Sequence, residues 1–382
     1  MLAIQDDKQR DMLSYFRNAF FSRSPKIQST DILTWLLIAG AVGLILMLSL
    51  KRSFNVDEFE GIKSAWKIFG GQRIYIDFFQ HHHPFLYYLL TPLFPLFGET
   101  NTTLFAARTL MLGFTFGSLI AMHELARRLF SRQMAAVSIL LLLTLPLFVG
   151  KTIEVRPDVP QTFFGLLSLL LLYRFFDSER RGLLLLSALS LGLAFLFLQK
   201  ALILIVLVHA VLMYRVICGQ LRLSLLLQFS AVLMAVWGGY CAYLAYTGQL
   251  SQYWFFNFDF NLYTLDHQKH QTKYLIGHIA NFSSVFLGLM LLGLLSRKTQ
   301  AQRELTLIAI SLLGVALVYR VQWPQYYMPA LPLLAIIAAS GWETIAQKHS
   351  VAGAACLVAA FIGASANYTY EIQHRNNQFQ LE

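Results

Sequence analysis

One polar stretch of the sequence, residues 55–88, combines two kinds of side chain that can do acid–base chemistry. Asp57 and Glu58 open it, Asp77 follows, and three consecutive histidines occupy His81–His83. A partly desolvated carboxylate can accept a proton from a hydroxyl group, and an imidazole can bind a metal or a phosphate. Adjacent side chains cannot all face one point on a helix, which favours phosphate contact by His83 over a metal site.

Further charged side chains lie in KTIEVRPDVPQ, residues 151–161, and at Lys200. Arg156 can pair with Glu154 or Asp158 in a purely structural arrangement, or Asp158 can orient Arg156 or a substrate while the prolines stiffen the loop. Lys200 lies between two apolar runs. It can extend to the membrane surface or attract an anionic phosphate, and the sequence leaves both readings open.

Long apolar runs must position these residues. The chain has 382 residues, of which 57% are hydrophobic and 13% charged, and its mean hydropathy is +0.55, which indicates an all-α integral membrane protein. A helix needs about 20 apolar residues to cross a bilayer. On that basis we expect about 11 spans, near residues 32–50, 104–122, 134–149, 160–176, 183–198, 201–214, 224–247, 275–295, 305–319, 327–346 and 351–366.

The distribution of Lys and Arg predicts the orientation, since short cytoplasmic loops retain these residues. It places a cytoplasmic tail at 1–31, a transmembrane domain at 32–366 and a short extracytoplasmic tail at 367–382. Residues 51–103 then form the first extracytoplasmic loop, in which DEFEGIKSAWKIFGG forms a helix and the proline-interrupted segment 84–98 lies at the interface or re-enters. All the candidate residues fall on this outer face. Asp57 alone could merely cap the helix that it begins.

Several classes are excluded or disfavoured. The net charge of +10 follows from cations on both sides of the membrane, so nucleic acid is not an expected partner. The sequence has no P-loop, GxGxxG, GxSxG or HExxH motif, and its three cysteines show no disulfide or metal-ligand spacing. The first span is too long, and follows too many polar residues, to be a cleaved signal peptide.

These segments, in this order, resemble the GT-C superfamily of membrane glycosyltransferases, in particular protein O-mannosyltransferases and the aminoarabinose transferases that modify lipid A. The resemblance covers most of the chain. It rests on Asp57-Glu58 after the first span, on GGQRIYIDFFQHHHPFLYYL, on Glu154 to Asp158, on Leu198 to Lys200 and on PQYYMPALP at 324–332. Three features differ: Phe85 follows Pro84 where many members have a second proline, His83 stands where some members carry a lysine, and the chain ends soon after its last expected span.

The resemblance implies a polyprenyl-phosphate sugar donor, transfer to an acceptor hydroxyl on the extracytoplasmic face, and inversion at the anomeric carbon. Asp57 would be the general base, with Glu58 supporting it. His82, His83, Arg156, Lys200 and Arg320 would contact the lipid phosphate or the sugar, while Asp77, Asp158 and Tyr326 would position substrates or neighbouring cations. No metal is indicated, although a divalent ion is compatible with the pattern.

The acceptor could be a lipid, a glycan or a protein, and the expected location is a bacterial inner membrane with the site facing the periplasm. Two other classes remain as alternatives. A secondary transporter or lipid flippase would need polar groups or broken helices in mid-span. A non-catalytic membrane assembly protein would tolerate single replacement of the outer acids.

Overall fold

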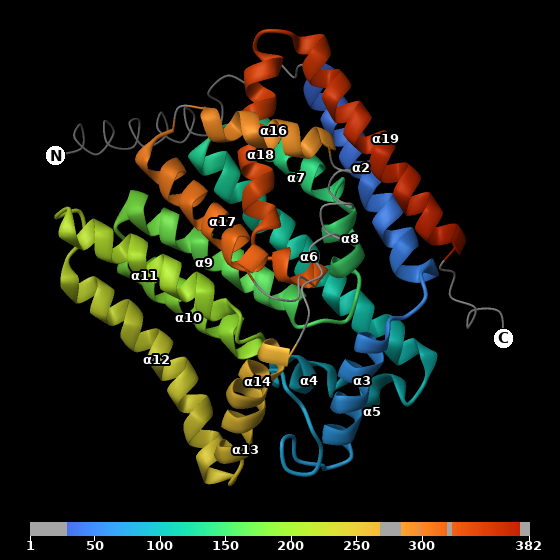
Figure 1. Ribbon diagram of the computed structural model, residues 1–382, viewed down its shortest axis with the longest axis vertical. Coiled ribbons are helices and arrows are strands. Elements are labelled where there is room, and N and C mark those ends of the chain that lie inside the picture. Colours follow the sequence, from blue (N-terminus) through green and yellow to red (C-terminus); the bar gives the residue numbers. More distant parts are fainter. Residues whose placement is uncertain (1–28, 268–283, 297, 319–322, 375–382) are drawn as a thin grey trace, which may run out of the picture.

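The computed structural model describes residues 29–267, 284–296, 298–318 and 323–374, and its regular elements there are helices (Figure 1). In chain order they are α2 (Ser29–Lys51), α3 (Val56–Phe69), α4 (Phe85–Leu90), α5 (Leu93–Phe97), α6 (Asn101–Leu129), α7 (Arg132–Leu143), α8 (Pro146–Thr152), α9 (Asp158–Ser178), α10 (Arg181–Phe197), α11 (Ala201–Ile217), α12 (Leu223–Tyr246), α13 (Leu250–Trp254), the π-helical turn η1 (Phe255–Asp259), α14 (Phe260–His267), α16 (Ser284–Leu295), α17 (Gln300–Val318), the 3₁₀ turn η2 (Pro324–Tyr327), α18 (Leu331–Ala346) and α19 (Ser350–His374).

Six of these helices are long and apolar enough to cross a membrane: α2, α6, α9, α12, α17 and α19. The pair α7 and α8 makes a seventh if it counts as one span, although it bends by 76° at the break. The expected number of eleven is therefore not confirmed. Reaching it would require α10, α11, α16 and α18 to cross as well, and these helices have only 12 to 17 residues in the described part of the chain. The all-helical, multi-pass membrane class is confirmed.

The helix ends differ from the expected boundaries at both ends of the chain. Helix α2 already begins at Ser29, and α19 continues to His374, so part of the expected C-terminal tail is helical. Residues 1–28 and 375–382 lie outside the described residues. Helices α2 and α19 pack against each other along one side of the molecule in Figure 1.

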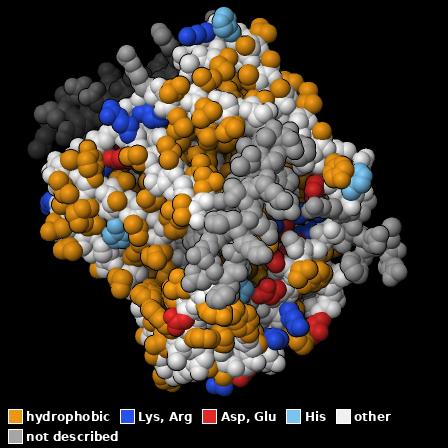
Figure 2. Space-filling model, in the orientation of Figure 1, with side chains coloured by type: hydrophobic (Ala, Val, Ile, Leu, Met, Phe, Trp, Pro, Cys, Tyr) orange, Lys and Arg blue, Asp and Glu red, His pale blue; other side chains and the backbone are white. Residues whose placement is uncertain are grey.

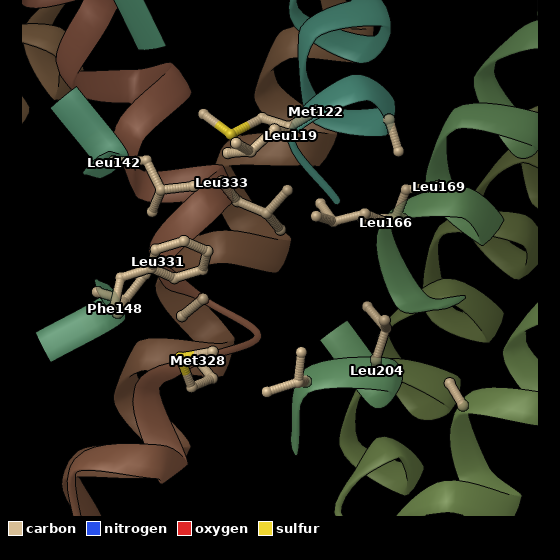
Figure 3. Close-up of a cluster of buried hydrophobic side chains, with 14 of the residues drawn as sticks. Leu119, Met122, Leu142, Phe148, Leu166, Leu169, Leu204, Met328, Leu331 and Leu333 are labelled. Atoms are coloured by element: carbon tan, nitrogen blue, oxygen red, sulfur yellow. The ribbon is translucent and has the colours of Figure 1, made fainter. Parts of the chain in front are cut away.

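The core is formed by leucine, methionine and phenylalanine side chains from α6, α7, α9, α11 and α18. Figure 3 shows Leu119 and Met122 of α6, Leu166 and Leu169 of α9, and Leu331 and Leu333 of α18 turned toward one another. Such interdigitation fixes the relative positions of helices that are distant in sequence. Figure 2 shows hydrophobic side chains spread over the α11 and α12 side, with acidic and basic side chains grouped toward α3 and α5.

Helices α3, α4 and α5 belong to the expected outer loop and lie together at one end of the molecule, near α13 and α14 (Figure 1). The expected helix DEFEGIKSAWKIFGG corresponds to α3, which Asn55 caps and which ends at Gly70. The proline-containing segment 84–98 forms the two short helices α4 and α5, of six and five residues, neither of which can span a bilayer.

Candidate active site

Polar loops and helix ends enclose a cavity of about 860 Å³ at this end of the molecule. Its walls come from the start of α3, the histidine segment, residues 151–158, the start of α11, η1 with α14, and η2. Of the residues that the sequence predicted for the site, Asp57, His82, Arg156, Asp158, Lys200 and Tyr326 line the cavity. Glu58, Asp77 and His83 do not line it, and Arg320 lies outside the described residues.

Asp57 reaches the cavity because it lies in the first turn of α3. Asn55 caps this turn, with its side chain accepting a hydrogen bond from the Asp57 backbone N–H. Successive helical side chains point about 100° apart, since a turn has 3.6 residues. The Asp57 side chain is consequently 50% exposed while that of Glu58 is fully buried. The two acids therefore have different surroundings.

Glu58 is the centre of a buried network that fixes α3 to the neighbouring helices. Its carboxylate accepts two hydrogen bonds from Arg108, at 2.8 Å from Nε and 2.7 Å from Nη2, and further bonds from the backbone N–H groups of Asn55 and Val155. Arg108 also donates to the carbonyl oxygens of Ser49, Arg52 and Ser53 at the end of α2. This paired geometry satisfies both buried charges. Glu58 therefore holds the first turn of α3, which also carries Asp57.

Four charged side chains of alternating sign follow one another along the cavity lining, which we term the cavity floor: Asp57, Arg156, Asp158 and Lys200. Arg156 Nη1 contacts Asp57 Oδ2, and Arg156 Nε lies 3.4 Å from Asp158 Oδ2. The Nζ atom of Lys200 lies 4.0 Å from the other oxygen of Asp158. Burial opposes the charge on Arg156, but the carboxylates of Asp158, Glu154 and Asp57 outweigh it and raise its pKa. Arg156 is thus a permanent cation beside Asp57.

Glu154 contacts Arg156 from outside the cavity lining. Its side chain is almost completely buried and binds Arg52 at 3.1 Å and Lys151 at 2.8 Å, with Arg156 at 3.6 Å. The sequence identified Glu154 as a possible partner of Arg156, which these contacts support. Because Arg52, Lys151 and Arg156 share the single carboxylate of Glu154, that carboxylate does not fully offset their positive charge. Arg156 can therefore still attract a bound anion.

Lys200 presents a cation whose protonation is finely balanced. Its ammonium group lies 3.6 Å from the centre of the Tyr326 ring. Burial lowers the pKa of Lys200 to about 8, since this effect and the nearby Arg156 outweigh the attraction of Asp158. An anionic ligand would supply the negative charge that this environment lacks.

His83 is held inside the protein by both ring nitrogens. Nδ1 lies 2.5 Å from the carbonyl oxygen of Phe195 and must donate to it, while Nε2 accepts from the Tyr253 hydroxyl at 3.1 Å. Burial lowers the pKa of His83 to about 4, so its ring is neutral at pH 7. These contacts fix the histidine segment and leave no ring nitrogen for a phosphate.

His81 and His82 face the cavity, and amide side chains hold their backbone. The Gln80 side chain accepts from the N–H groups of His81 and His82, at 2.8 and 3.3 Å. The His81 carbonyl oxygen accepts from Gln199 at 3.2 Å and from Asn261 at 2.9 Å. Burial is the main cause that lowers the pKa of both histidines, and nearby Lys200 lowers it further.

Asp77 lies in a surface turn outside the cavity lining. It accepts a hydrogen bond from the Arg73 backbone N–H at 2.7 Å, and that bond lowers the pKa of its carboxyl group. Tyr75 in the same turn has φ of 70°, a left-handed conformation that the surrounding contacts stabilise. The Y-x-D pattern therefore encodes a turn that presents Tyr75, whose hydroxyl donates to the His82 carbonyl oxygen at 2.8 Å.

Sequence reasoning missed several cavity residues. Glu60 lies one helical turn from Asp57, and the amides Gln199, Asn257 and Asn261 come from segments dominated by apolar or aromatic residues. The 3.6-residue period could have identified Glu60, whereas nothing in the local sequence distinguishes the amides.

In the described residues, no group of three or more His, Cys, Asp or Glu side chains has a geometry that could hold a metal ion.

Residues 81–246 match the family model described as dolichyl-phosphate-mannose-protein mannosyltransferase. This region contains Arg156, Asp158 and Lys200 and begins after Asp57. No curated protein matches the sequence significantly.

Solved membrane glycosyltransferases share the fold. ArnT from Cupriavidus metallidurans bound to undecaprenyl phosphate matches with a TM-score of 0.64 and 18% identity, over 83% of this chain and 61% of that chain. The archaeal oligosaccharyltransferase AglB from Archaeoglobus fulgidus, in complex with an inhibitory peptide and a dolichol-phosphate, matches with a TM-score of 0.62 and 14% identity. That match covers 88% of this chain and 56% of AglB, so the chain spans less than two thirds of either protein.

Proposed function

We propose that this chain moves a sugar from a polyprenyl-phosphate donor to an acceptor hydroxyl, because its fold is similar to that of ArnT and AglB and residues 81–246 match the mannosyltransferase family model. One observation carries the proposal. A single large cavity brings Asp57, a carboxylate accessible to a substrate, together with the cations Arg156 and Lys200. A base and an anion site at close quarters are what transfer from a phosphate leaving group requires.

The proposed reaction is a single displacement. The acceptor oxygen forms a bond to the anomeric carbon while the bond from that carbon to the phosphate oxygen breaks and its electrons leave with the phosphate. The acceptor proton passes to Asp57. Since Arg156 contacts Oδ2 of Asp57, the Oδ1 atom remains for the acceptor hydroxyl. One displacement inverts the anomeric configuration.

Lys200 and Arg156 would stabilise the charge that develops on the departing phosphate. Asp158 lies between them and Tyr326 lies against Lys200, which supports positioning roles for both residues. Arg320 remains a proposed phosphate contact on sequence grounds alone. The contacts of Glu58 and His83 support positioning roles rather than direct contact with the substrate, whereas Asp77 holds a surface turn outside the cavity lining.

The proposed orientation places the cavity on the extracytoplasmic face, as in a periplasm-facing site of a bacterial inner membrane. Lys200 precedes α11 at the cavity, whereas Arg215 near the other end of α11 binds Glu304 of α17 at 2.8 Å. Arg128 and Asp177 form another ion pair at the ends of α6 and α9. The basic residues expected in cytoplasmic loops thus lie away from the cavity.

The lipid chain of the donor would extend from the cavity along apolar side chains. Leu202, Ile203, Phe258 and Leu262 contribute to its lining beside Lys200. Such an arrangement suits a ligand with a charged head and a long hydrocarbon tail. The acceptor class, whether lipid, glycan or protein, stays open in this proposal.

The direct test is incubation of the purified protein with radiolabelled polyprenyl-phosphate sugars and membrane extract. We expect a new labelled product with inverted anomeric configuration, released together with free polyprenyl phosphate. The same donors are then supplied to sealed vesicles that contain the protein. Label that accumulates inside without chemical change would contradict transfer and identify a transporter or flippase.

A further inference from the structure

Four neutral side chains on one wall of the cavity form what we term the amide–imidazole patch: His81, His82, Gln199 and Asn257. Each contributes a buried atom that has no hydrogen-bond partner among the described residues, namely His81 Nδ1, His82 Nδ1, Gln199 Oε1 and Asn257 Oδ1. An unpaired buried polar atom is costly and is rare in folded proteins. Four such atoms on one wall indicate a ligand with several hydrogen-bonding groups.

Other contacts hold the patch in place without using these atoms. Gln199 and Asn261 donate to the His81 carbonyl oxygen, and Asn261 also donates to the Asn257 carbonyl oxygen at 3.0 Å. Asn257 itself is 1% exposed and donates through Nδ2 to the Tyr253 carbonyl oxygen at 3.1 Å. The amide groups of Gln199 and Asn257 are therefore held through their nitrogens, and the two histidines through their backbone, which preorganises the unpaired atoms.

The patch carries no formal charge at neutral pH. Two of its members are amides, and burial lowers the pKa of His81 and His82, so that both rings are neutral. Neutral acceptors and donors match hydroxyl groups, whereas a phosphate is better matched by Lys200 and Arg156. The neutral amide–imidazole patch thus lies in the same cavity as the cations Lys200 and Arg156.

The neutral wall lies where a donor sugar must be. In a polyprenyl-phosphate sugar, the ring is bonded directly to a phosphate oxygen. Gln199 precedes Lys200 in the chain, and the charge of Lys200 is close enough to lower the pKa of His81 and His82. We propose that the amide–imidazole patch binds the hydroxyl groups of the donor sugar ring. This assignment rests on the proposed function.

The test compares lipid phosphates with and without a sugar, bound to the full-length protein in nanodiscs. The probes are undecaprenyl phosphate and undecaprenyl phosphate carrying mannose, glucose or galactose. His81→Phe removes Nδ1 but keeps an aromatic ring beside Phe79, which lies 5.7 Å from the His81 ring. His81→Asn keeps a polar atom in the δ position. Gln249→Met is the matched control, because its unpaired amide oxygen lies outside the cavity lining.

We expect His81→Phe and Asn257→Leu to weaken the best sugar-bearing lipid roughly 3- to 10-fold, as for one lost neutral hydrogen bond. Binding of undecaprenyl phosphate should stay unchanged, His81→Asn should recover most of the loss, and Gln249→Met should behave as the wild type. Equal weakening of both lipids, or of neither, would overturn the patch as a sugar site.

Two outcomes would reject the patch as the donor-sugar site and leave the proposed function intact. If the variants raise the acceptor KM and leave donor binding unchanged, the patch binds the acceptor and the donor assignment is wrong. If the wild-type protein transfers sugar but binds sugar-bearing lipids no more tightly than undecaprenyl phosphate, and no variant changes this, the patch makes no contribution. Failure of the wild-type protein to bind any of these lipids contradicts the proposed function itself.

Discussion

Asp57 and Glu58 are neighbours on one helical turn, yet they have opposite surroundings. Asp57 is half-exposed in the cavity, and Glu58 is buried against Arg108. The difference follows from helical geometry alone, which turns the second side chain toward the core. A pair of adjacent acids can thus combine one group that is open to a cavity with one that is buried in the core.

The Glu58–Arg108 pair is predicted to stabilise the fold strongly. Glu58→Gln leaves the buried Arg108 guanidinium without a counter-charge, and breaking a buried pair in this way costs about 3 to 5 kcal/mol. We expect a markedly lower thermal midpoint in detergent, measured by tryptophan fluorescence, and a parallel loss of activity.

A double variant provides the control for this pair. Glu58→Gln combined with Arg108→Met removes both charges, so it should unfold at a higher temperature than Glu58→Gln alone. If the two substitutions instead destabilise additively, the charges do not stabilise one another and Glu58 has another role.

Lys200 predicts a pH dependence of lipid phosphate binding. Its pKa of about 8 makes it a cation below pH 8 and progressively neutral above it. The second pKa of a phosphate monoester is near 6, so the ligand charge is constant across this range. Affinity for undecaprenyl phosphate should consequently fall as the pH rises from 7.5 to 9.5. The measurement is equilibrium binding in nanodiscs.

Lys200→Arg tests whether this titration belongs to Lys200. A guanidinium stays charged throughout the range, so the variant should lose most of the fall in affinity. The same decline in Lys200→Arg as in the wild type would assign the titration to another group.

At the scale of elements, helix α3 and the short helices α4 and α5 form a platform that carries Asp57. The position of α3 could be predicted because its cap, its acidic first turn and its terminal glycines are local signals. The break between α7 and α8 comes just before Pro146, which has no N–H group to continue the preceding helix and can begin the next one. The angle of 76° at this break depends on tertiary packing, which the local sequence does not encode.

Helices α16 and α18 cross so closely that glycine is required at the contact. A Cβ atom on Gly341 would lie 1.9 Å from the carbonyl oxygen of Leu289, and one on Gly293 would lie 1.9 Å from that of Ile337. Gly341→Ala should therefore lower stability by about 1 to 3 kcal/mol or more through overpacking. Thermal unfolding in detergent measures this effect.

Gly288→Ala and Gly314→Ala are the matched controls. A Cβ at either position meets no atom within 4 Å, so alanine should leave stability unchanged or raise it by up to about 1 kcal/mol. Equal destabilisation by Gly341→Ala and Gly314→Ala would contradict a specific contact between α16 and α18.

At the scale of the whole molecule, the sequence predicted the class of fold and most of the cavity floor. Asp57, Arg156 with Asp158, and Lys200 lie in three separate segments that alternation of spans assigns to one face, and the structure brings them together. The burial of the His83 ring could not be predicted from the sequence, because its partners Phe195 and Tyr253 are far away in the chain. Contacts across such separations depend on packing that local patterns do not carry.

The orientation of the molecule in the membrane is a separate prediction. Cys218 is exposed just after α11, whereas Lys200 lies before the other end of the same helix. Gln72, exposed after α3, lies in the expected outer loop. In intact cells, a membrane-impermeant maleimide should label a Gln72→Cys variant and should label Cys218 only after the membrane is opened. The reverse pattern would place the cavity on the cytoplasmic face.

The proposed transfer reaction depends most on Asp57 as the base, and a pair of acid-to-amide variants tests this role. Asp57→Asn and Asp77→Asn change the same group in the same loop, but only Asp57 lines the cavity. In single-turnover transfer from a radiolabelled polyprenyl-phosphate sugar, Asp57→Asn should be slower by roughly 10²- to 10⁴-fold, with a folded protein that still binds donor, while Asp77→Asn stays near the wild-type rate. Wild-type rates from Asp57→Asn would contradict the proposed mechanism.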